Sequence, residues 1–190
     1  MLKTTIHKTC ETERNVQIGS GTKIWNNSHI RKDSIIGKNC VLGFNTFIDE
    51  GVILGNNVKI QNGVSVYSGI ILKDFVFCGP NATFVTDKFP RSKFPKSRED
   101  YIKLIVEEGA TIGGNATIVC VKHIGKYSLI GAGAVVTKDV PEYSIIMGNP
   151  ARVVGYICEC GEKLNFKNTS TTCKCKRKYK LIKKKVIKIE

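Results

Sequence analysis

Two close pairs of cysteines lie near the carboxyl end of the chain, Cys158 with Cys160 and Cys173 with Cys175. Four thiolates brought together by two short turns can hold one zinc ion in a closed tetrahedral site. Such an ion orders a segment that is too small to have a core of its own. Spare thiols are the second interpretation and disulfides the third, because a reducing compartment keeps cysteines as thiols. The spacing therefore predicts a zinc knuckle within residues 158–190.

The histidines are few, and they bear on two kinds of catalysis. His7, His29 and His123 are the three in the chain, and no two of them are close in sequence. An enzymatic metal site of three histidines needs a closer set, so this class of metalloenzyme is excluded. His123 is a candidate general base, with a plain surface histidine as the alternative.

The charge of the chain is strongly positive and unevenly distributed. The 190 residues include 30 Lys and Arg against 16 Asp and Glu, a formal net charge of +14. Roughly half of the excess lies in residues 158–190, where a solvated surface is the first interpretation, ahead of nucleic acid or an anionic membrane. A positive field also speeds the capture of phosphate-bearing small substrates. The sequence has no signal peptide and no membrane-length apolar run, so we expect a cytoplasmic protein.

A strict six-residue period organises the chain around these residues. A bulky, mostly aliphatic residue occupies every sixth position from 18 to 84, and the period returns from 106 to 136. The positions are Ile18, Ile24, Ile30, Ile36, Leu42, Ile48, Leu54, Ile60, Val66, Leu72, Cys78 and Phe84, then Val106, Ile112, Ile118, Ile124, Ile130 and Val136. Neither helical spacing nor strand alternation fits this pattern. A fixed repeat of this kind predicts a β-solenoid.

Two further positions of each hexad support that prediction. Four residues after most bulky residues comes a small or β-branched one, which we expect to fill the interior. Three residues after it usually comes Gly, Asn or Asp, from Gly21 to Asp139, as tight corners with positive φ require. Three such sides close a triangular coil, and coils stack at about 4.8 Å. We therefore expect an all-β fold, a parallel β-helix of about six triangular coils with atypical ends.

The period is interrupted once and is irregular at one other place. Phe84 and Val106 are 22 residues apart, which is not a multiple of six, so residues 87–105 must leave the prism and return. This excursion mixes prolines, aromatics and basic residues, and long loops on rigid scaffolds usually bind something, although a plain surface insertion is the alternative. At residues 121–123, Lys122 falls on an inward position. Either the wall bulges and turns Lys122 outward, or a functional side chain justifies the strain.

These features together resemble a known family, the left-handed β-helix acyltransferases, over residues 1–157. The closing stretch that carries the resemblance reads IGAGAVVTKDVP at residues 130–141 and GNPAR at 148–152. The left hand is implied by this resemblance and not by the period. Segments 60–67, 77–80 and 89–93 are similar to N-acetyltransferases of nucleotide-linked 3-amino sugars. The stretch DKFPRS at 87–92 favours the dTDP-3-amino-3,6-dideoxyhexose enzymes, with the UDP-linked 3-amino uronic acid enzymes as near relatives.

The resemblance implies a homotrimer whose active sites lie between prisms, with acetyl-CoA along the groove and the excursion reaching a neighbouring subunit. It places backbone at Gly114 and Ala132 against the pantetheine arm of the coenzyme. Lys138 and Arg152 would approach the phosphates, and Pro150 would border the adenine.

For the nucleotide sugar, the same resemblance implies contacts from several polar residues along the prism. They are Asn62, Tyr67, Asn81, Asp87 and Arg91, together with Arg31 as a contact to the diphosphate or base. Relatives read FTND where this chain reads FVTD, so Thr86 stands where an Asn orients the reacting group.

The chemistry is attack of a sugar amine on an acetyl thioester, which needs alignment and a hydrogen-bond donor for the oxyanion. Asp87 is one candidate to take the proton of the amine, His123 is another, and the departing thiolate is the third. The sequence thus predicts an acetyl-CoA-dependent sugar N-acetyltransferase that serves a surface polysaccharide or glycan. The alternative is a non-catalytic trimeric scaffold whose tail binds a partner or nucleic acid, and the coenzyme motifs argue against it.

Overall fold

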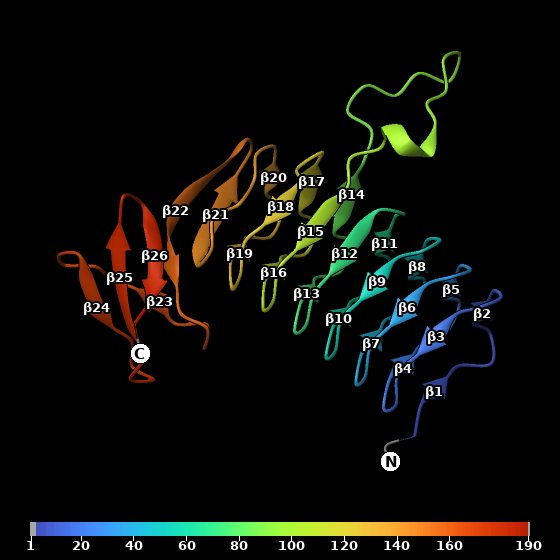
Figure 1. The fold of residues 1–190 in the computed structure, drawn as a ribbon, viewed down its shortest axis with the longest axis horizontal. Coiled ribbons are helices and arrows are strands. Elements are labelled where there is room, and N and C mark those ends of the chain that lie inside the picture. Colours follow the sequence, from blue (N-terminus) through green and yellow to red (C-terminus); the bar gives the residue numbers. More distant parts are fainter. Residues whose placement is uncertain (1–2, 190) are drawn as a thin grey trace.

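The computed structural model describes residues 3–189, and residues 1, 2 and 190 lie outside this description. Three sheets of very short parallel strands form a stacked prism, with the two ends of the chain at opposite ends of the molecule (Figure 1). The first sheet stacks β1 (Thr5–Ile6), β4 (Lys23–Ile24), β7 (Val41–Leu42), β10 (Lys59–Ile60), β13 (Phe77–Cys78), β16 (Thr111–Ile112), β19 (Leu129–Ile130) and β21 (Ser144–Gly148). The expected all-β parallel β-helix is confirmed.

The other two walls of the prism have the same construction. The second sheet stacks β2 (Glu11–Thr12), β5 (His29–Ile30), β8 (Phe47–Ile48), β11 (Ser65–Val66), β14 (Thr83–Val85), β17 (Thr117–Val119) and β20 (Val135–Val136). The third sheet stacks β3 (Gln17–Ile18), β6 (Ile35–Ile36), β9 (Ile53–Leu54), β12 (Ile70–Leu72), β15 (Leu104–Val106) and β18 (His123–Ile124). Outside the excursion, one coil takes 18 residues, as the pairing of Lys59 with Val41 and Phe77 shows.

The prism has about eight coils, so the expectation of about six was too low. The extra coils come from the irregular start of the chain and from β21. Thr5 pairs with Lys23 and Glu11 pairs with His29, in register with the regular coils. Strand pairing therefore continues where the bulky inward residues stop, because backbone hydrogen bonds do not depend on side-chain type.

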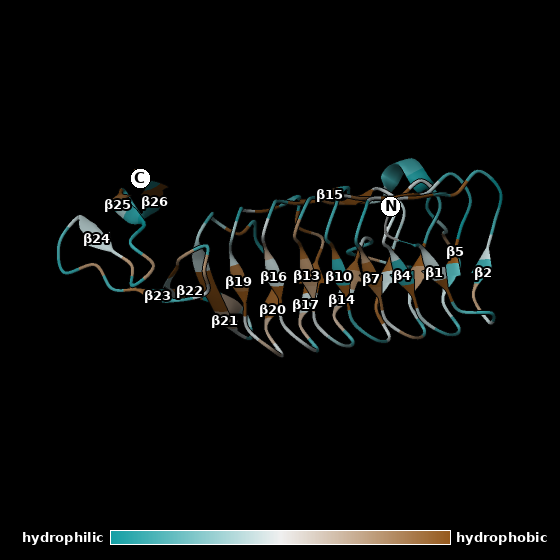
Figure 2. Ribbon diagram, turned by 90° about the horizontal axis from the view of Figure 1, so that it is seen from below, coloured by the Kyte–Doolittle hydropathy of each residue, from teal (hydrophilic) through white to brown (hydrophobic). Residues whose placement is uncertain are grey.

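The core is a single column of side chains inside the prism. Of the predicted bulky positions from 24 to 136, all are buried, while Ile18 packs against the core from a partly exposed end. Cys40 and Cys78 belong to this core, and burial raises the pKa of the Cys78 thiol to about 12. Apolar strand positions recur along much of the prism in Figure 2, whereas β2 in the first coil is hydrophilic.

The corners have the predicted backbone conformation with one exception. Gly21 and Asn27 are typical, with φ of 75° and 56°, and the same conformation recurs at the other predicted corners as far as Gly133. Asp139 does not have it, so that prediction was wrong. Its carboxylate instead accepts hydrogen bonds from the backbone N–H groups of Lys122 and His123, at 2.8 and 3.1 Å.

The irregular hexad follows the first of its two expected alternatives. Cys120 takes the positive φ of 49° one residue early, and Val121 fills the interior position with 4% of its surface exposed. Lys122 is therefore turned outward and is exposed.

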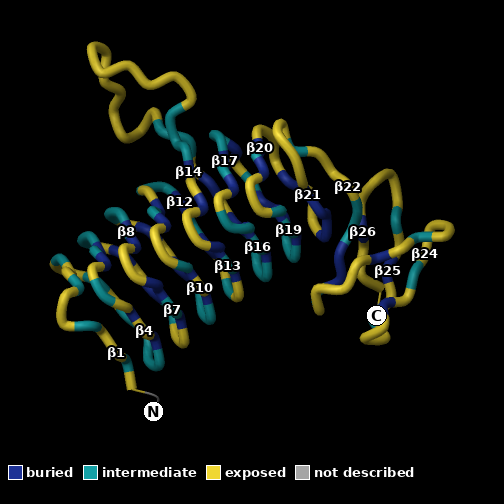
Figure 3. The backbone as a smooth tube through the Cα atoms, turned by 180° about the vertical axis from the view of Figure 1, so that it is seen from behind, coloured by how far each residue is buried: buried dark blue, intermediate teal, exposed yellow. Residues whose placement is uncertain are grey.

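The excursion leaves the prism after β14 and spans residues 86–103, ending two residues before the expected end at 105 because Leu104–Val106 is strand β15. It projects away from the coils and contains one short 3₁₀ helix, η1 (Arg98–Asp100) (Figure 1). Residues 89–100 are all exposed, as the yellow segment in Figure 3 shows.

The extension after the prism is built from antiparallel strands. β22 (Ala151–Ile157) pairs with β21, and β23 (Lys163–Leu164) pairs with β22 at the edge of the first sheet. A separate three-stranded sheet follows, made of β24 (Ser170–Thr172), β25 (Lys178–Ile182) and β26 (Lys185–Lys188). Among residues 3–189, no helix is long and apolar enough to cross a membrane.

Candidate functional site

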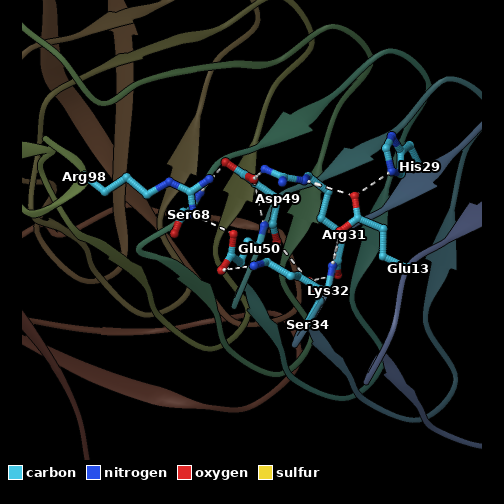
Figure 4. Close-up of polar contacts among 9 residues, drawn as sticks. All are labelled: Glu13, His29, Arg31, Lys32, Ser34, Asp49, Glu50, Ser68 and Arg98. Carbon is cyan, nitrogen blue, oxygen red and sulfur yellow. Dashed lines mark hydrogen bonds and ion pairs between the residues drawn. The ribbon is translucent and has the colours of Figure 1, made fainter. Parts of the chain in front are cut away.

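A column of polar side chains follows the corner between the second and third sheets, which we call the loop corner because the excursion starts there. Glu13, Arg31, Asp49 and Tyr67 are spaced by 18 residues along it. The Arg31 guanidinium donates to Asp49 Oδ1 at 2.8 Å and to Glu13 Oε1 at 3.2 Å (Figure 4). Two carboxylates from adjacent coils therefore orient Arg31, which is one of the predicted substrate-binding residues.

A second set of ion pairs at the same corner anchors the excursion. Arg98 of η1 places its Nη1 2.6 Å from Glu50 Oε2, and Lys32 Nζ lies 3.2 Å from Glu50 Oε1 (Figure 4). These contacts, that of Arg98 above all, hold the pKa of Glu50 below its ordinary value although partial desolvation opposes them. The excursion is thus held against the prism at its returning arm.

Aromatic rings lie beside this polar column. Tyr67 is 40% exposed, and its ring centroid lies 6.3 Å from that of Phe47. Phe47 in turn meets His29 edge to face at 5.7 Å. An exposed ring two coils along from a fixed guanidinium can stack on a planar base while the guanidinium binds a phosphate.

The predicted catalytic Asp87 and Thr86 lie at the root of the excursion. Lys96 forms an ion pair with the Asp87 carboxylate, which also accepts the N–H of Phe89 at 2.9 Å. Lys96 first, and then the N–H of Phe89, hold the pKa of Asp87 below its ordinary value against partial desolvation. The carbonyl of Thr86 accepts the N–H of Ile102 at 3.0 Å, which closes the base of the excursion.

Arg91 lies farther out on the excursion and is exposed. Its Nη1 donates to the carbonyl of Pro90 at 2.9 Å, and the rest of the guanidinium faces solvent. The rings of Phe89 and Phe94 beside it are 66% and 70% exposed. The tip of the excursion therefore exposes one cation and two apolar rings, which are available for contact with a ligand or another chain.

His123, the other candidate base, has a separate partner. Its Nε2 lies 3.4 Å from Glu107 Oε1, and Lys73 Nζ lies 3.0 Å from the same carboxylate. Burial raises the pKa of Glu107, but Lys73 and His123 outweigh this and leave it below its ordinary value. No hydrogen bond or ion pair joins His123 to Asp87 within residues 3–189. The two candidates therefore offer two distinct proton-transfer groups.

The predicted residues Asn62, Asn81, Gly114 and Ala132 lie at a different edge, the corner between the first and second sheets, which we call the amide corner. Asn62 Oδ1 accepts the N–H of Phe44 at 3.1 Å, and the backbone of Asn62 accepts the N–H of Asn81 at 3.0 Å. Gly114 and Ala132 occupy the next coils, 18 residues apart. A Cβ added at Gly114 would lie 3.3 Å from the carbonyl oxygen of Pro80 in the adjacent coil, so the two backbones approach closely there.

The cationic pair predicted for the coenzyme is brought together near the last coil. Lys138 and Arg152 line one pocket of about 180 Å³, together with residues 136–141 and Val153. Both side chains are exposed, and Pro150 lies in the turn between β21 and β22. Two cations at one opening are suited to phosphate groups.

The predicted residues thus form groups at two corners of one prism. No hydrogen bond or ion pair joins Asn62 or Asn81 to Arg31, Tyr67 or Asp87 in the described part of the chain. Sequence reasoning missed Lys96, Glu107 and Asp49, the partners of three predicted residues. For Asp49 a signal existed, because it lies 18 residues after Arg31 and the period stacks such residues.

Comparisons with known proteins agree with this architecture. The bacterial transferase hexapeptide family (six repeats) matches residues 15–50, and the hexapeptide repeat of succinyl-transferase matches residues 34–68 and 103–138. The chain is 46% identical over 82 residues to dTDP-3-amino-3,6-dideoxy-alpha-D-galactopyranose 3-N-acetyltransferase of Aneurinibacillus thermoaerophilus. It is 51% identical over 49 residues to the bifunctional protein GlmU of Thermotoga maritima.

The extent of these matches is limited. The first covers 43% of this chain and 43% of the relative, and the second covers 26% and 11%. The chain therefore spans less than half the length of either curated relative. Among solved structures, a UDP-N-acetylglucosamine acyltransferase of Francisella novicida superposes with a TM-score of 0.53 at 16% identity, over 81% of this chain and 67% of that one. Over residues 15–68 and 103–138 the chain therefore carries hexapeptide repeats similar to those of bacterial transferases.

Proposed function

We propose that this protein is an acetyl-CoA-dependent N-acetyltransferase that acylates the 3-amino group of a nucleotide-linked sugar, with dTDP-3-amino-3,6-dideoxyhexose as the favoured acceptor. The observation that carries the proposal is the 46% identity to an enzyme named for this reaction, on a β-helix with an excursion at the loop corner. The acetamido sugar would serve a surface polysaccharide or glycan. We place the reaction in the cytoplasm, where acetyl-CoA is available.

The coenzyme would lie along the last coils. Lys138 and Arg152, at one pocket, would bind its phosphates, and Pro150 would border the adenine. The backbone at half-buried Gly114 and exposed Ala132 would contact the pantetheine arm, which carries amide groups that pair with backbone.

The acceptor would lie at the loop corner. The Tyr67 ring, backed by Phe47, would stack on the base, while Arg31 and Arg91 would bind the diphosphate. Asn62 and Asn81 would hydrogen-bond the sugar from the amide corner of a neighbouring subunit.

The chemistry requires the nitrogen to lose two protons, one before attack and one as the tetrahedral intermediate collapses. The Asp87 carboxylate would take a proton from the sugar ammonium, and the neutral amine would then attack the thioester carbon. The C–S bond breaks as the amide forms, and the leaving thiolate takes the second proton of the attacking nitrogen. The products are the N-acetyl sugar, CoA thiol and one released proton. Thr86, next to Asp87, would use its hydroxyl to hydrogen-bond and orient the reacting group.

The distribution of the predicted site residues and an apolar stripe support the proposal of a homotrimer. Ile35, Ile53, Ile71 and Ile105 pair in register on the outer face of the third sheet, and three of them are 37–40% exposed. A stripe of this kind is typical of a protein interface. The third sheet borders the loop corner, so packing through this stripe would set the loop corner of each subunit against a neighbouring prism.

The test is a thiol-release assay with acetyl-CoA and a panel of dTDP- and UDP-linked 3-amino sugars, with product mass measured for each. A mass gain of one acetyl group on a dTDP-linked acceptor supports the proposal. No thiol release on any acceptor, from protein that remains folded by circular dichroism, contradicts it.

The pH profile of kcat should identify the base. Because the pKa of Asp87 is lowered, mainly by Lys96, its carboxylate stays ionised into acid, and activity should persist to lower pH than an ordinary aspartate would allow. The variant K96M removes the first cause of the lowered pKa, so the acid limb should move upward. K93M is the control, because Lys93 lies over the Phe94 ring and pairs with no carboxylate in the described excursion. An acid limb that K96M leaves unchanged and that vanishes in H123Q would instead assign the base to His123.

A further inference from the structure

The four cysteines of the extension converge on one point. Cys158 and Cys160 follow β22, and Cys173 and Cys175 lie between β24 and β25. Their four Sγ atoms all lie within 4.8 Å of one another, with closest approaches of 3.5 Å for Cys158 to Cys175 and 3.6 Å for Cys160 to Cys173. A tetrahedral zinc ion with Zn–S bonds of about 2.3 Å has S–S edges of about 3.8 Å. A disulfide requires sulfurs about 2.05 Å apart.

The two cysteine pairs lie in turns of the same construction. The N–H of Cys158 donates to the carbonyl of Glu162 at 2.8 Å, and the N–H of Gly161 donates to the carbonyl of Cys158 at 2.9 Å. In the second turn, Cys173 donates to Arg177 and Lys176 donates to Cys173, both at 2.9 Å. The residue after each second cysteine has a positive φ, 90° at Gly161 and 74° at Lys176. Each turn therefore aims two thiols at one centre in spite of the one-residue spacing.

Donors surround the sulfurs on the protein side. The Tyr179 hydroxyl, which is fully buried, lies 3.1 Å from Cys158 Sγ. Arg177 donates through Nη1 to Cys175 Sγ at 3.2 Å, and its Nε lies 3.0 Å from Glu159 Oε2. A hydrogen bond and a positive charge of this kind support anionic sulfur ligands around a metal ion.

The same cluster forms the centre of the extension and its junction with the prism. Buried Tyr143, Cys158, Leu164, Cys173, Tyr179 and Val186 form a small hydrophobic cluster of their own. Tyr143 belongs to the last coil, stacks on Tyr127 at 5.6 Å and donates to Glu159 at 3.2 Å. Two of the six buried residues are cysteines, so little apolar area remains to hold the extension in place.

We propose that Cys158, Cys160, Cys173 and Cys175 bind one Zn²⁺ ion as thiolates, and that this ion fixes the extension onto the last coil. All four positions are filled by protein ligands, so the site is structural and has no open position for a substrate. The proposal stands apart from the acetyltransferase reaction, because none of its residues belongs to the groups assigned to coenzyme or sugar.

The experiment uses elemental mass spectrometry to measure the metal content of the full chain, purified under reducing conditions. We expect about one zinc per chain in the wild type and less than about a tenth in the double variant C160S/C175S. C120S is the matched control and should keep its zinc, because Cys120 lies at an irregular corner of the prism. Limited proteolysis should then cleave the basic extension of the double variant while the prism stays intact.

A second measurement does not depend on the folding of any variant. Wild-type protein stripped with a chelator and given Co²⁺ should show the absorption of tetrahedral cobalt with sulfur-to-metal charge transfer, which Zn²⁺ then abolishes. Iron in place of zinc, two disulfides in the intact mass of freshly purified protein, or reduced thiols without zinc and without the cobalt spectrum would each overturn the proposal. Zinc retained at wild-type level in the double variant would overturn it as well.

Discussion

Replacing Asp87 by Asn is expected to lower kcat by about 100- to 10,000-fold, the usual contribution of a positioned base. Asn keeps the size of the side chain and an oxygen that accepts the N–H of Phe89, which lies 2.9 Å from the Asp87 carboxylate. It removes the charge that pairs with Lys96 and the ability to take a proton at neutral pH. The measurement is the initial rate of thiol release with the dTDP-linked acceptor under saturating conditions.

The control for this substitution lies in the same excursion. Asp100 accepts the N–H and hydroxyl of Ser97 at 3.1 and 3.0 Å and has no role in the proposed chemistry. D100N should therefore keep kcat within about twofold of wild type, since exposed surface changes usually have small effects. Equal kcat in D87N and wild type would show that Asp87 is not the base and would leave proton removal to His123 or to the thiolate.

Replacing Ile60 by Ala should reduce the free energy of unfolding by about 2–5 kcal/mol, the range for aliphatic truncation in a close-packed core. Ile60 is fully buried and pairs with Leu42 and Cys78 in the adjacent coils of the first sheet. The cavity left behind cannot collapse, because the coils above and below are fixed by strand hydrogen bonds. The measurement is the midpoint of urea denaturation in wild type and variant. An unchanged slope of unfolding free energy against urea concentration shows that stability, and not the unfolded state, has changed.

Ile6 provides the matched control, because it occupies the same column of the first sheet at the exposed end. Its side chain is 43% exposed, so I6A should cost less than about 1 kcal/mol. Equal losses in I60A and I6A would mean that the six-residue column does not carry the stability of the prism.

The interior of the prism could be predicted from sequence because each rule acts within one hexad. A buried side chain, a small neighbour and a left-handed corner repeat at fixed spacing, so errors occur only where the local signal changes. Phe75 and Tyr127 adopt positive φ of 59° and 51° although neither residue type indicates it, because the stacked coils impose the corner. The first coils were missed for the opposite reason, since Glu11 and Thr12 lack the apolar signal while still pairing as strands.

The six-residue period could not predict which residues pair with the candidate site residues in the excursion. Lys96 meets Asp87 across a nine-residue loop, and Arg98 meets Glu50 across 48 residues. Such contacts depend on the path of an irregular segment, which no period describes. The convergence of the four cysteines was predictable in outline, because two short turns with paired thiols indicate one shared centre.

Because every coil has the same height, the number of coils between two residues sets the distance between them along the prism axis. Thr83 pairs with Thr117, and Thr117 pairs with Val135, so two coil steps, or about 10 Å, separate the root of the excursion from the Lys138 level along the axis. An insertion of 18 residues between these levels would add one whole coil without disturbing its neighbours. It would also lengthen that separation by about 4.8 Å. The length of such a chain can therefore change freely at its ends, but between the two proposed ligand levels it changes only in steps that alter the distance between the two proposed substrates.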